Sequence, residues 1–217
     1  YRPYRAGVMN LQENTTYKLG IDIGSTTIKL TVLNNEDEMV FGRYQRHFSN
    51  IQGTLLEMAE AAKKELGDIS FTAMITGSGG LSLANWVGTS FIQEVVAVST
   101  AISLVAPSTD VAIEIGGEDA KIIYFTNGLE QRMNGIWSGG TGSFIDQRAT
   151  LLQTDATGLN ELAKDYKTLY PIAARCGVFA KSDIQPLINE GVARSDLAAS
   201  IFQSIVSQTI SGLACGK

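Results

Sequence analysis

The sequence predicts an α/β fold of two lobes, each of which opens with a β-hairpin meander. Two segments, residues 18–46 and 111–134, each hold three short runs rich in β-branched and apolar residues, separated by small turn residues. Apolar residues at helical spacing follow both segments. The chain has 217 residues, of which 44% are hydrophobic and 18% charged, a balance typical of a globular protein with a sizeable core.

Residues 1–16 show no clear period and are interpreted as a lead-in to the first lobe, which we place at residues 17–106. Gly24-Ser25-Thr26-Thr27 is expected to form a tight turn between the first two strands. The expected elements are, in chain order, strands at 18–23, 28–34 and 39–46, a helix at 54–66, a strand at 71–76 and a helix at 93–105.

The pattern restarts at Val111, so the second lobe is placed at residues 107–217. The chain begins at Tyr1 and stops directly after a long helical pattern, and we therefore expect an excised portion whose second lobe is truncated at its C-terminal end. The expected elements are strands at 111–115, 120–126 and 129–134, a helix at 143–152, and a mostly helical remainder that is interrupted at Pro171 and Pro186 and ends in a helix at 195–214.

Charge and composition exclude several classes of function. The chain carries 17 basic and 22 acidic side chains, so its net charge is −5, and such an acidic surface argues against nucleic-acid binding. No apolar run approaches the roughly 18–20 residues of a membrane span. Two cysteines are too few for a disulfide framework and favour a reducing compartment. We therefore expect a cytoplasmic protein without a nucleic-acid or membrane partner.

The first candidate site is the turn that follows the first strand. Gly24 allows close backbone approach to a phosphate, and successive N–H groups in such a turn form an anion-binding concavity. Ser25, Thr26 and Thr27 can add hydroxyl donors. Asp22, at the strand end, is placed to hold a magnesium ion through water, because Mg²⁺ keeps several waters when it binds protein. The alternative is an ordinary hairpin with a solvated Asp.

The second candidate site is the turn that joins the first two strands of the second lobe. Like Gly24 in the first turn, Gly116 and Gly117 allow the backbone to approach a phosphate closely. Glu118 and Asp119 add negative charge to this turn. Acids in both turns would repel a polyphosphate unless a divalent metal bridges them. Two such turns therefore favour ATP with Mg²⁺, with Glu118 or Asp119 organising metal and water. The alternative is a surface hairpin with a buried glycine pair.

A third glycine-rich stretch, Gly139-Gly140-Thr141-Gly142, opens the expected helix at 143–152. A helix N-terminus presents unpaired N–H groups and a partial positive charge, which suit a phosphate or ribose. The alternative is a loop with a Thr N-cap.

Together these motifs carry a resemblance to a known family. The chain is similar to the 2-hydroxyacyl-CoA dehydratase activators and benzoyl-CoA reductase ATPases, a branch of the acetate/sugar kinase, Hsp70 and actin superfamily. The resemblance covers most of residues 18–217. The residues that carry it are Leu19 to Thr27, Glu114 to Lys121, Met133 to Gly135, Gly139 to Asp146 and Ala174 to Asp183.

The resemblance implies an actin-like ATPase fold, with two ribonuclease-H-like lobes and ATP or ADP in the cleft between them. Lys29 and Lys121, at the ends of the two phosphate motifs, are added as nucleotide-binding candidates. The implied function is a reductive activator: a homodimer or a pair of tandem modules hydrolyses ATP and passes a low-potential electron to an acyl-CoA dehydratase or reductase partner. The family implies one [4Fe-4S] cluster at the module interface, with two cysteines from each module.

Two departures from the family pattern bear on this reading. Cys176 matches the second cluster cysteine, but Trp137 stands where the family has the first, and Trp cannot ligate iron. Cys215 lies outside the family's ligand positions and is interpreted as a small buried residue. The glycine pair that helps to hold adenosine in the superfamily has no counterpart after Gly216.

Two other functions stay open. One is a small-molecule kinase on the same fold, for which no acid beside an acceptor pocket can be singled out. The other is a non-catalytic, nucleotide-responsive interaction module in which Trp137 is an interface anchor. His47, the only histidine, is interpreted as a surface residue.

Overall fold

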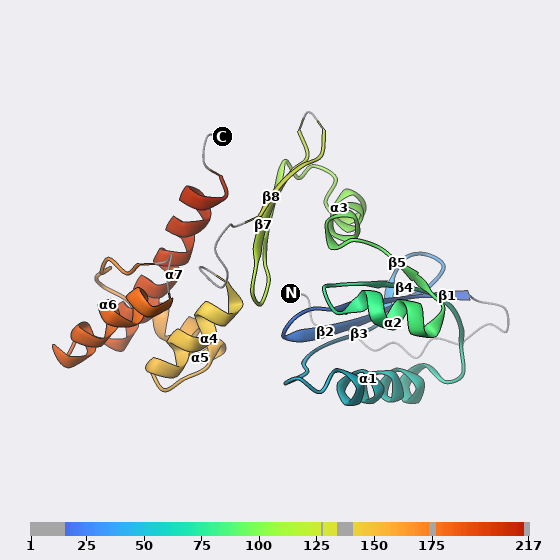
Figure 1. Cartoon of the computed structure of the whole chain (residues 1–217), viewed down its shortest axis with the longest axis horizontal. Helices are drawn as coiled ribbons and strands as arrows, with labels where there is room; N and C mark the ends of the chain where they lie inside the picture. The colour runs from blue at the N-terminus through green and yellow to red at the C-terminus, as the bar shows by residue number, and fades with distance from the viewer. Residues whose placement is uncertain (1–15, 127, 134–140, 174–176, 215–217) are drawn as a thin grey trace. The chain divides into compact units, whose positions relative to one another are not determined.

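The computed structural model describes residues 16–126, 128–133, 141–173 and 177–214. The chain divides into two compact units, Tyr1–Glu94 and Val95–Lys217 (Figure 1). The division falls at the start of helix α3 (Glu94–Val105), upstream of the boundary expected near residue 106. The domain limits at 17–106 and 107–217 stay predictions.

The first unit is a mixed sheet covered by a long helix. Its strand order is β3-β2-β1-β4-β5, and the central strand β1 pairs antiparallel with β2 and parallel with β4. Helix α1 lies along one face of the sheet (Figure 1), where its Met58 is buried with Ile23, Ile28 and Leu30. The elements are β1 (Thr16–Ile23), β2 (Thr27–Leu33), β3 (Met39–Arg46), α1 (Ile51–Leu66), β4 (Ser70–Thr76), α2 (Gly80–Val87) and β5 (Ser90–Phe91).

Local signals explain where α1 begins and ends. The side chain of Asn50 accepts a hydrogen bond from the backbone N–H of Gly53 at 3.1 Å, which satisfies one of the free donors of the first turn. Gly67, at φ +76°, closes the helix with its N–H donating to the Lys63 carbonyl. The predicted stop at Gly67 is therefore confirmed, and the helix starts a few residues before the expected position 54.

The second unit combines a small antiparallel sheet with a helical cluster. The sheet has the order β6-β7-β8, and every residue of β7 is buried. The helices enclose a core of their own that includes Phe144, Leu159, Ile184 and Leu197. The elements after α3 are β6 (Val111–Ile115), β7 (Ala120–Tyr124), β8 (Glu130–Met133), α4 (Gly142–Leu151), α5 (Ala156–Ala163), α6 (Gly177–Asn189) and α7 (Arg194–Gly212).

Side chains of α7 hold the segment that runs between α5 and α6. Asp196 accepts hydrogen bonds from the backbone N–H groups of Lys167 and Thr168, at 2.7 and 3.1 Å. The Ser200 hydroxyl accepts one from the N–H of Tyr170 at 2.8 Å. The chain therefore stays close to α7 until Pro171, where the predicted interruption is observed.

The predicted interruption at Pro186 is wrong, because α6 continues through it. Proline removes one N–H donor and crowds the preceding turn, which usually ends or bends a helix. Here Ile184 is fully buried and Leu187 and Ile188 pack against the same core, so burial of the α6 face offsets the lost hydrogen bond. The structure also forms α2 and β5, which the pattern did not predict.

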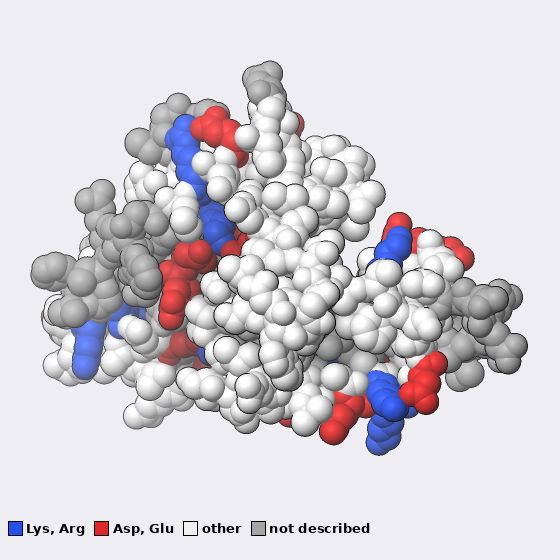
Figure 2. All heavy atoms as spheres, turned by 45° about the vertical axis from the view of Figure 1, so that its right-hand side comes forward, with Lys and Arg blue, Asp and Glu red and all other residues white. Residues whose placement is uncertain are grey.

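No helix among the described residues has the length and apolar character that a membrane crossing requires. On the face that Figure 2 shows, basic and acidic side chains lie beside one another rather than gathering in separate areas. Exposed ion pairs join Lys18 to Asp37 at 2.5 Å and Lys63 to Asp68 at 3.0 Å.

Candidate functional site

The first candidate turn joins the central strand β1 to β2. Asp22 and Lys29 are cross-strand partners, and the Lys29 Nζ atom lies 2.6 Å from the Asp22 Oδ2 atom. Inside the turn, the N–H of Gly24 donates to the carbonyl of Thr27 at 3.0 Å. The side chain of Ser25 is exposed, whereas Thr27 is 9% exposed. The predicted phosphate turn is therefore a tight hairpin whose acid is already paired with a lysine.

The second candidate turn, between β6 and β7, repeats this arrangement. Glu114 and Lys121 are cross-strand partners, and the N–H of Gly116 donates to the carbonyl of Asp119 at 2.8 Å. In both turns an acid and an Ile end one strand, a Gly follows them, and a Lys in the next strand lies seven positions after the acid. This spacing is the sequence signal of the repeat, since antiparallel partners in equal turns must be equally far apart in sequence.

The two turns differ in the burial of their lysine. The Lys121 residue is 8% exposed, and its Nζ atom lies 3.0 Å from the Asp119 Oδ2 atom and 3.8 Å from the Glu114 Oε2 atom. The Lys29 side chain is 48% exposed, and its Nζ atom lies 5.6 Å from the centre of the Tyr44 ring. Glu118 is exposed at the tip of the second turn. The second turn thus places more negative charge around a buried cation.

The start of helix α4 packs against the second turn. The N–H groups of Gly142 and Ser143 donate to the carbonyls of Gly116 and Gly117, both at 2.9 Å. A Cβ atom on Gly142 would lie 3.2 Å from the Gly116 carbonyl oxygen, so only glycine fits without a shift. Thr141 is fully buried at the N-cap position. The structure therefore brings part of the third predicted motif to the second, while Gly139 and Gly140 lie outside the described residues.

A loop that was not predicted to belong to the site packs against the first turn. It follows β4, where Gly77 has φ +94°. The N–H of Gly79 donates to the Ile23 carbonyl at 2.9 Å. A Cβ atom on Gly77 would lie 2.3 Å from that carbonyl oxygen and 2.5 Å from the Asp22 Oδ1 atom. Two close glycines after a strand were a usable signal, because they permit such an approach.

The interpretation of His47 as a surface residue is wrong. The residue is 6% exposed, and its Nε2 atom lies 3.2 Å from the carbonyl oxygen of Gly24. Its backbone N–H donates to the carbonyl of Thr26, also at 3.2 Å. The pairing of β2 with β3 brings His47 to the turn, because Arg46, which directly precedes His47, is the strand partner of Thr27. Register, rather than residue type, was the missing information.

The predicted metal ligands are only partly covered by the structure. Cys176, Trp137 and Cys215 lie outside the described residues. Among the side chains that are described, no group of three or more His, Cys, Asp or Glu could hold a metal ion. Asp22, the predicted water-mediated magnesium ligand, has one carboxylate oxygen against Lys29 and the other beside Gly77.

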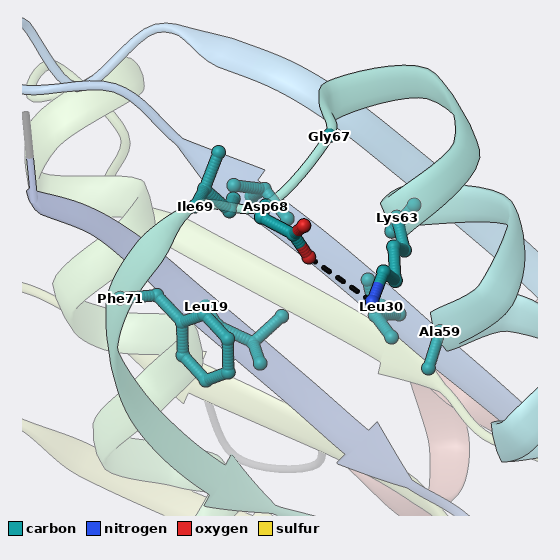
Figure 3. A pocket seen from close by; sticks show the side chains of 10 residues that line it. Leu19, Leu30, Ala59, Lys63, Gly67, Asp68, Ile69 and Phe71 are labelled. Carbon is teal, nitrogen blue, oxygen red and sulfur yellow. Dashed lines mark ion pairs between the residues drawn. The ribbon is translucent and has the colours of Figure 1, made fainter. Parts of the chain in front are cut away.

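The first unit also contains a pocket whose lining is mostly apolar, unlike the polar turns. It has a volume of about 180 Å³ and lies between α1 and the sheet, where Leu19, Leu30 and Phe71 line it (Figure 3). Lys63 and Asp68 point toward each other at its edge, and their Nζ and Oδ1 atoms are 3.0 Å apart. Its two charged side chains thus form an ion pair with each other.

The chain is similar in sequence to a known family of ATPases and to activators of acyl-CoA dehydratases. Residues 19–214 match the profile of the BadF/BadG/BcrA/BcrD ATPase family. The chain is 32% identical to the (R)-2-hydroxyglutaryl-CoA dehydratase activating ATPase of Acidaminococcus fermentans, over 91% of this chain and 77% of the relative. It is 30% identical to the activator of lactoyl-CoA dehydratase of Anaerotignum propionicum, over 92% of this chain and 76% of the relative.

A solved structure agrees with the sequence relatives. The activator of the 2-hydroxyisocaproyl-CoA dehydratase from Clostridium difficile with bound ADPNP superimposes with a TM-score of 0.81 at 27% identity. The match covers 90% of this chain and 74% of that one. The predicted α/β, actin-like ATPase fold is confirmed. The relatives are activators of acyl-CoA dehydratases.

Proposed function

Because the chain belongs to the BadF/BadG/BcrA/BcrD ATPase family, we propose that it binds Mg²⁺-ATP with its two hairpin turns and hydrolyses it to activate an acyl-CoA dehydratase or reductase. The observation that carries this proposal is the repeated turn: the same backbone hydrogen bond, the same acid–lysine partners and the same glycine position occur in both units.

A glycine begins each turn, so no side chain limits access to the backbone at that position. A Cβ atom on Gly116 would lie 2.6 Å from the Asp119 Oδ1 atom, closer than real Cβ atoms approach, whereas one on Gly24 would lie 3.4 Å from the Thr27 carbonyl oxygen, an ordinary contact. Without those atoms, the N–H groups of the turn can approach a phosphate closely. We assign phosphate contacts to residues 24–27, to Gly116 and Gly117, and to the stretch 139–142. Lys29 and Lys121 balance the negative charge of the acids beside them.

The acids of the turns are assigned to metal and water. Asp22, oriented by its contact with Lys29, would hold a water of the magnesium shell, since Mg²⁺ usually binds proteins through few carboxylates and several waters. Glu118 or Asp119 would orient the water that attacks the terminal phosphate. When bound, Mg²⁺ neutralises charge that develops on the phosphate oxygens. Hydrolysis then changes the free energies of two conformations of the activator differently, which is how it can drive a partner.

The finer part of the proposal is electron transfer through a [4Fe-4S] cluster shared by two chains or two tandem modules. Cys176 is the family ligand that this chain retains, and Trp137 occupies the other ligand position. Two modules would then supply two thiolates where four are usual. Phosphate binding and hydrolysis by the turns need neither residue.

Two measurements test the proposal. The first is release of phosphate from ATP without any acceptor, for the unaltered chain and for Asp22→Asn. We expect acceptor-independent hydrolysis that the substitution lowers by about 10²-fold or more. Hydrolysis that requires a sugar or acid acceptor would favour a kinase instead, and nucleotide-dependent dimerisation without hydrolysis would favour a non-catalytic module.

The second measurement is anaerobic iron–sulfur reconstitution of the unaltered chain beside Trp137→Cys, with absorbance and iron per dimer as readouts. Cluster uptake by the variant alone would support Trp137 as the missing ligand position. A full cluster in the unaltered chain would show that other ligands are used. If neither takes up iron, the electron-transfer part of the proposal fails, and the ATPase part stands on the first measurement.

A further inference from the structure

His47 contacts the first turn through both its side chain and its backbone. The imidazole Nδ1 atom accepts a hydrogen bond from the N–H of Ser49 at 3.1 Å. A ring nitrogen that accepts carries no proton, so in the neutral imidazole the proton is on Nε2. The Nε2–H group therefore donates to the carbonyl of Gly24 at 3.2 Å. The backbone N–H of His47 donates to the carbonyl of Thr26, two residues after Gly24.

These two contacts determine which way two amide groups of the turn face. In a planar trans peptide the C=O and N–H bonds point in opposite directions, and the described residues contain no cis peptide bond. Since the Gly24 carbonyl faces His47, the N–H of Ser25 faces away from it. Since the Thr26 carbonyl also faces His47, the N–H of Thr27 likewise faces away from His47. His47 thus keeps two N–H donors of the turn, those of Ser25 and Thr27, directed away from itself.

We propose that His47 is a positioning residue for nucleotide binding: it holds the Gly24 and Thr26 carbonyls so that the Ser25 and Thr27 N–H groups face the phosphate. This inference rests on the proposed function, because it assigns the orientation of the same turn. The role needs a donor at the Nε2 position, and acceptance from Ser49 by Nδ1 is what places the proton of a neutral imidazole there.

The backbone after His47 supports a positioning role. Phe48 and Ser49 have φ values of +44° and +65°, in the left-handed region that non-glycine residues rarely adopt. The N–H of Asn50 donates to the His47 carbonyl at 2.6 Å, and Asn50 caps helix α1. This strained turn fixes the histidine between the candidate phosphate turn and the start of α1, while the Phe48 side chain itself is 83% exposed.

Two amide substitutions separate the contacts of the ring. In His47→Gln the side-chain NH₂ group reaches the position of Nε2 and can donate to Gly24. In His47→Asn the side-chain oxygen reaches only the position of Nδ1 and can accept from Ser49, so the Gly24 contact is lost. We expect His47→Asn to weaken binding of Mg²⁺-ADP about ten-fold, and His47→Gln to bind within about two-fold of the unaltered chain.

Calorimetry measures Mg²⁺-ADP binding to the unaltered chain and to both variants. Thermal unfolding of both variants is measured in parallel. Equal Mg²⁺-ADP affinity in the unaltered chain, His47→Gln and His47→Asn would overturn the inference and leave the proposed function in place. Absence of Mg²⁺-ADP binding to the unaltered chain would overturn the proposed function, and this role with it. Equal loss in both variants would also overturn the inference, since it would mean that filling the space matters and donation does not.

A measurement on the unaltered chain keeps the inference testable if His47→Asn does not fold. Long-range ¹H–¹⁵N spectra distinguish the two neutral tautomers of the single histidine. We expect the proton on Nε2, and ADP should shift the amide resonances of Ser25 and Thr27. A proton on Nδ1, or ADP binding that leaves both amides unshifted, would overturn the inference.

Discussion

Replacing Gly77 by alanine tests whether the loop after β4 is packed against the first turn as tightly as the structure indicates. The new Cβ atom would meet the Ile23 carbonyl oxygen at 2.3 Å and the Asp22 Oδ1 atom at 2.5 Å. Real Cβ atoms essentially never come closer than 3.0 Å, so the Ile23 carbonyl must move by about 0.7 Å. That carbonyl also accepts the hydrogen bond from Gly79.

Two terms contribute to the expected loss of stability. The φ of +94° at Gly77 lies where an L side chain is disfavoured, which costs about 1–2 kcal/mol. Forcing backbone out of the way in a packed region adds about 1–3 kcal/mol. We therefore expect Gly77→Ala to destabilise the first unit by about 2–5 kcal/mol. The push on Asp22 should also weaken ATP hydrolysis.

Gly88→Ala is the matched control. Gly88 lies in the same unit at φ +69°, and a Cβ atom there would have no neighbour within 4 Å, so this variant carries the backbone term alone. The assay is native-state hydrogen exchange of the amides of β1 and β4, which reports the opening free energy of the first unit itself. A loss for Gly77→Ala that does not exceed the loss for Gly88→Ala would refute the packing argument.

Three further outcomes follow from side-chain contacts. Lys121→Met, which leaves two acids without their buried cation, should lower the free energy of unfolding by about 1–3 kcal/mol in urea denaturation. The equivalent Lys29→Met, at an exposed pair, should cost under about 1 kcal/mol, and equal losses would contradict the difference in burial. Asp196→Ala should lower the free energy of unfolding by about 1–3 kcal/mol in a thermal scan, because two backbone N–H groups lose their acceptor; an unchanged midpoint would refute this. The hydrogen bond and charge of Lys164 lower the pKa of the exposed Glu161. This pair therefore stabilises the fold at neutral pH and loses its effect as the pH falls through that lowered pKa. In ¹³C titrations Lys164→Gln should return the pKa of Glu161 to its ordinary range, and an unmoved pKa would show that Lys164 is not the cause.

The sequence predicted the elements whose causes are local. Runs rich in β-branched and apolar residues, bounded by small turn residues, placed the strands of both meanders within a few residues of their observed limits. It did not predict α2, because Gly79 and Gly80 at its start looked like a loop. It misplaced a break at Pro186, because the burial of Ile184 and its neighbours is not visible in a single helix turn.

Both hairpin turns follow from the sequence alone, since a glycine, an acid and a lysine at fixed spacing along a hairpin become partners without help from the rest of the chain. The groups that pack against these turns become visible only in the folded chain. His47 reaches Gly24, Gly77 reaches Ile23 and Gly142 reaches Gly116 across long stretches of chain. Contacts of that kind depend on strand register and helix docking, which arise when a whole hydrophobic core closes and not from any one short segment.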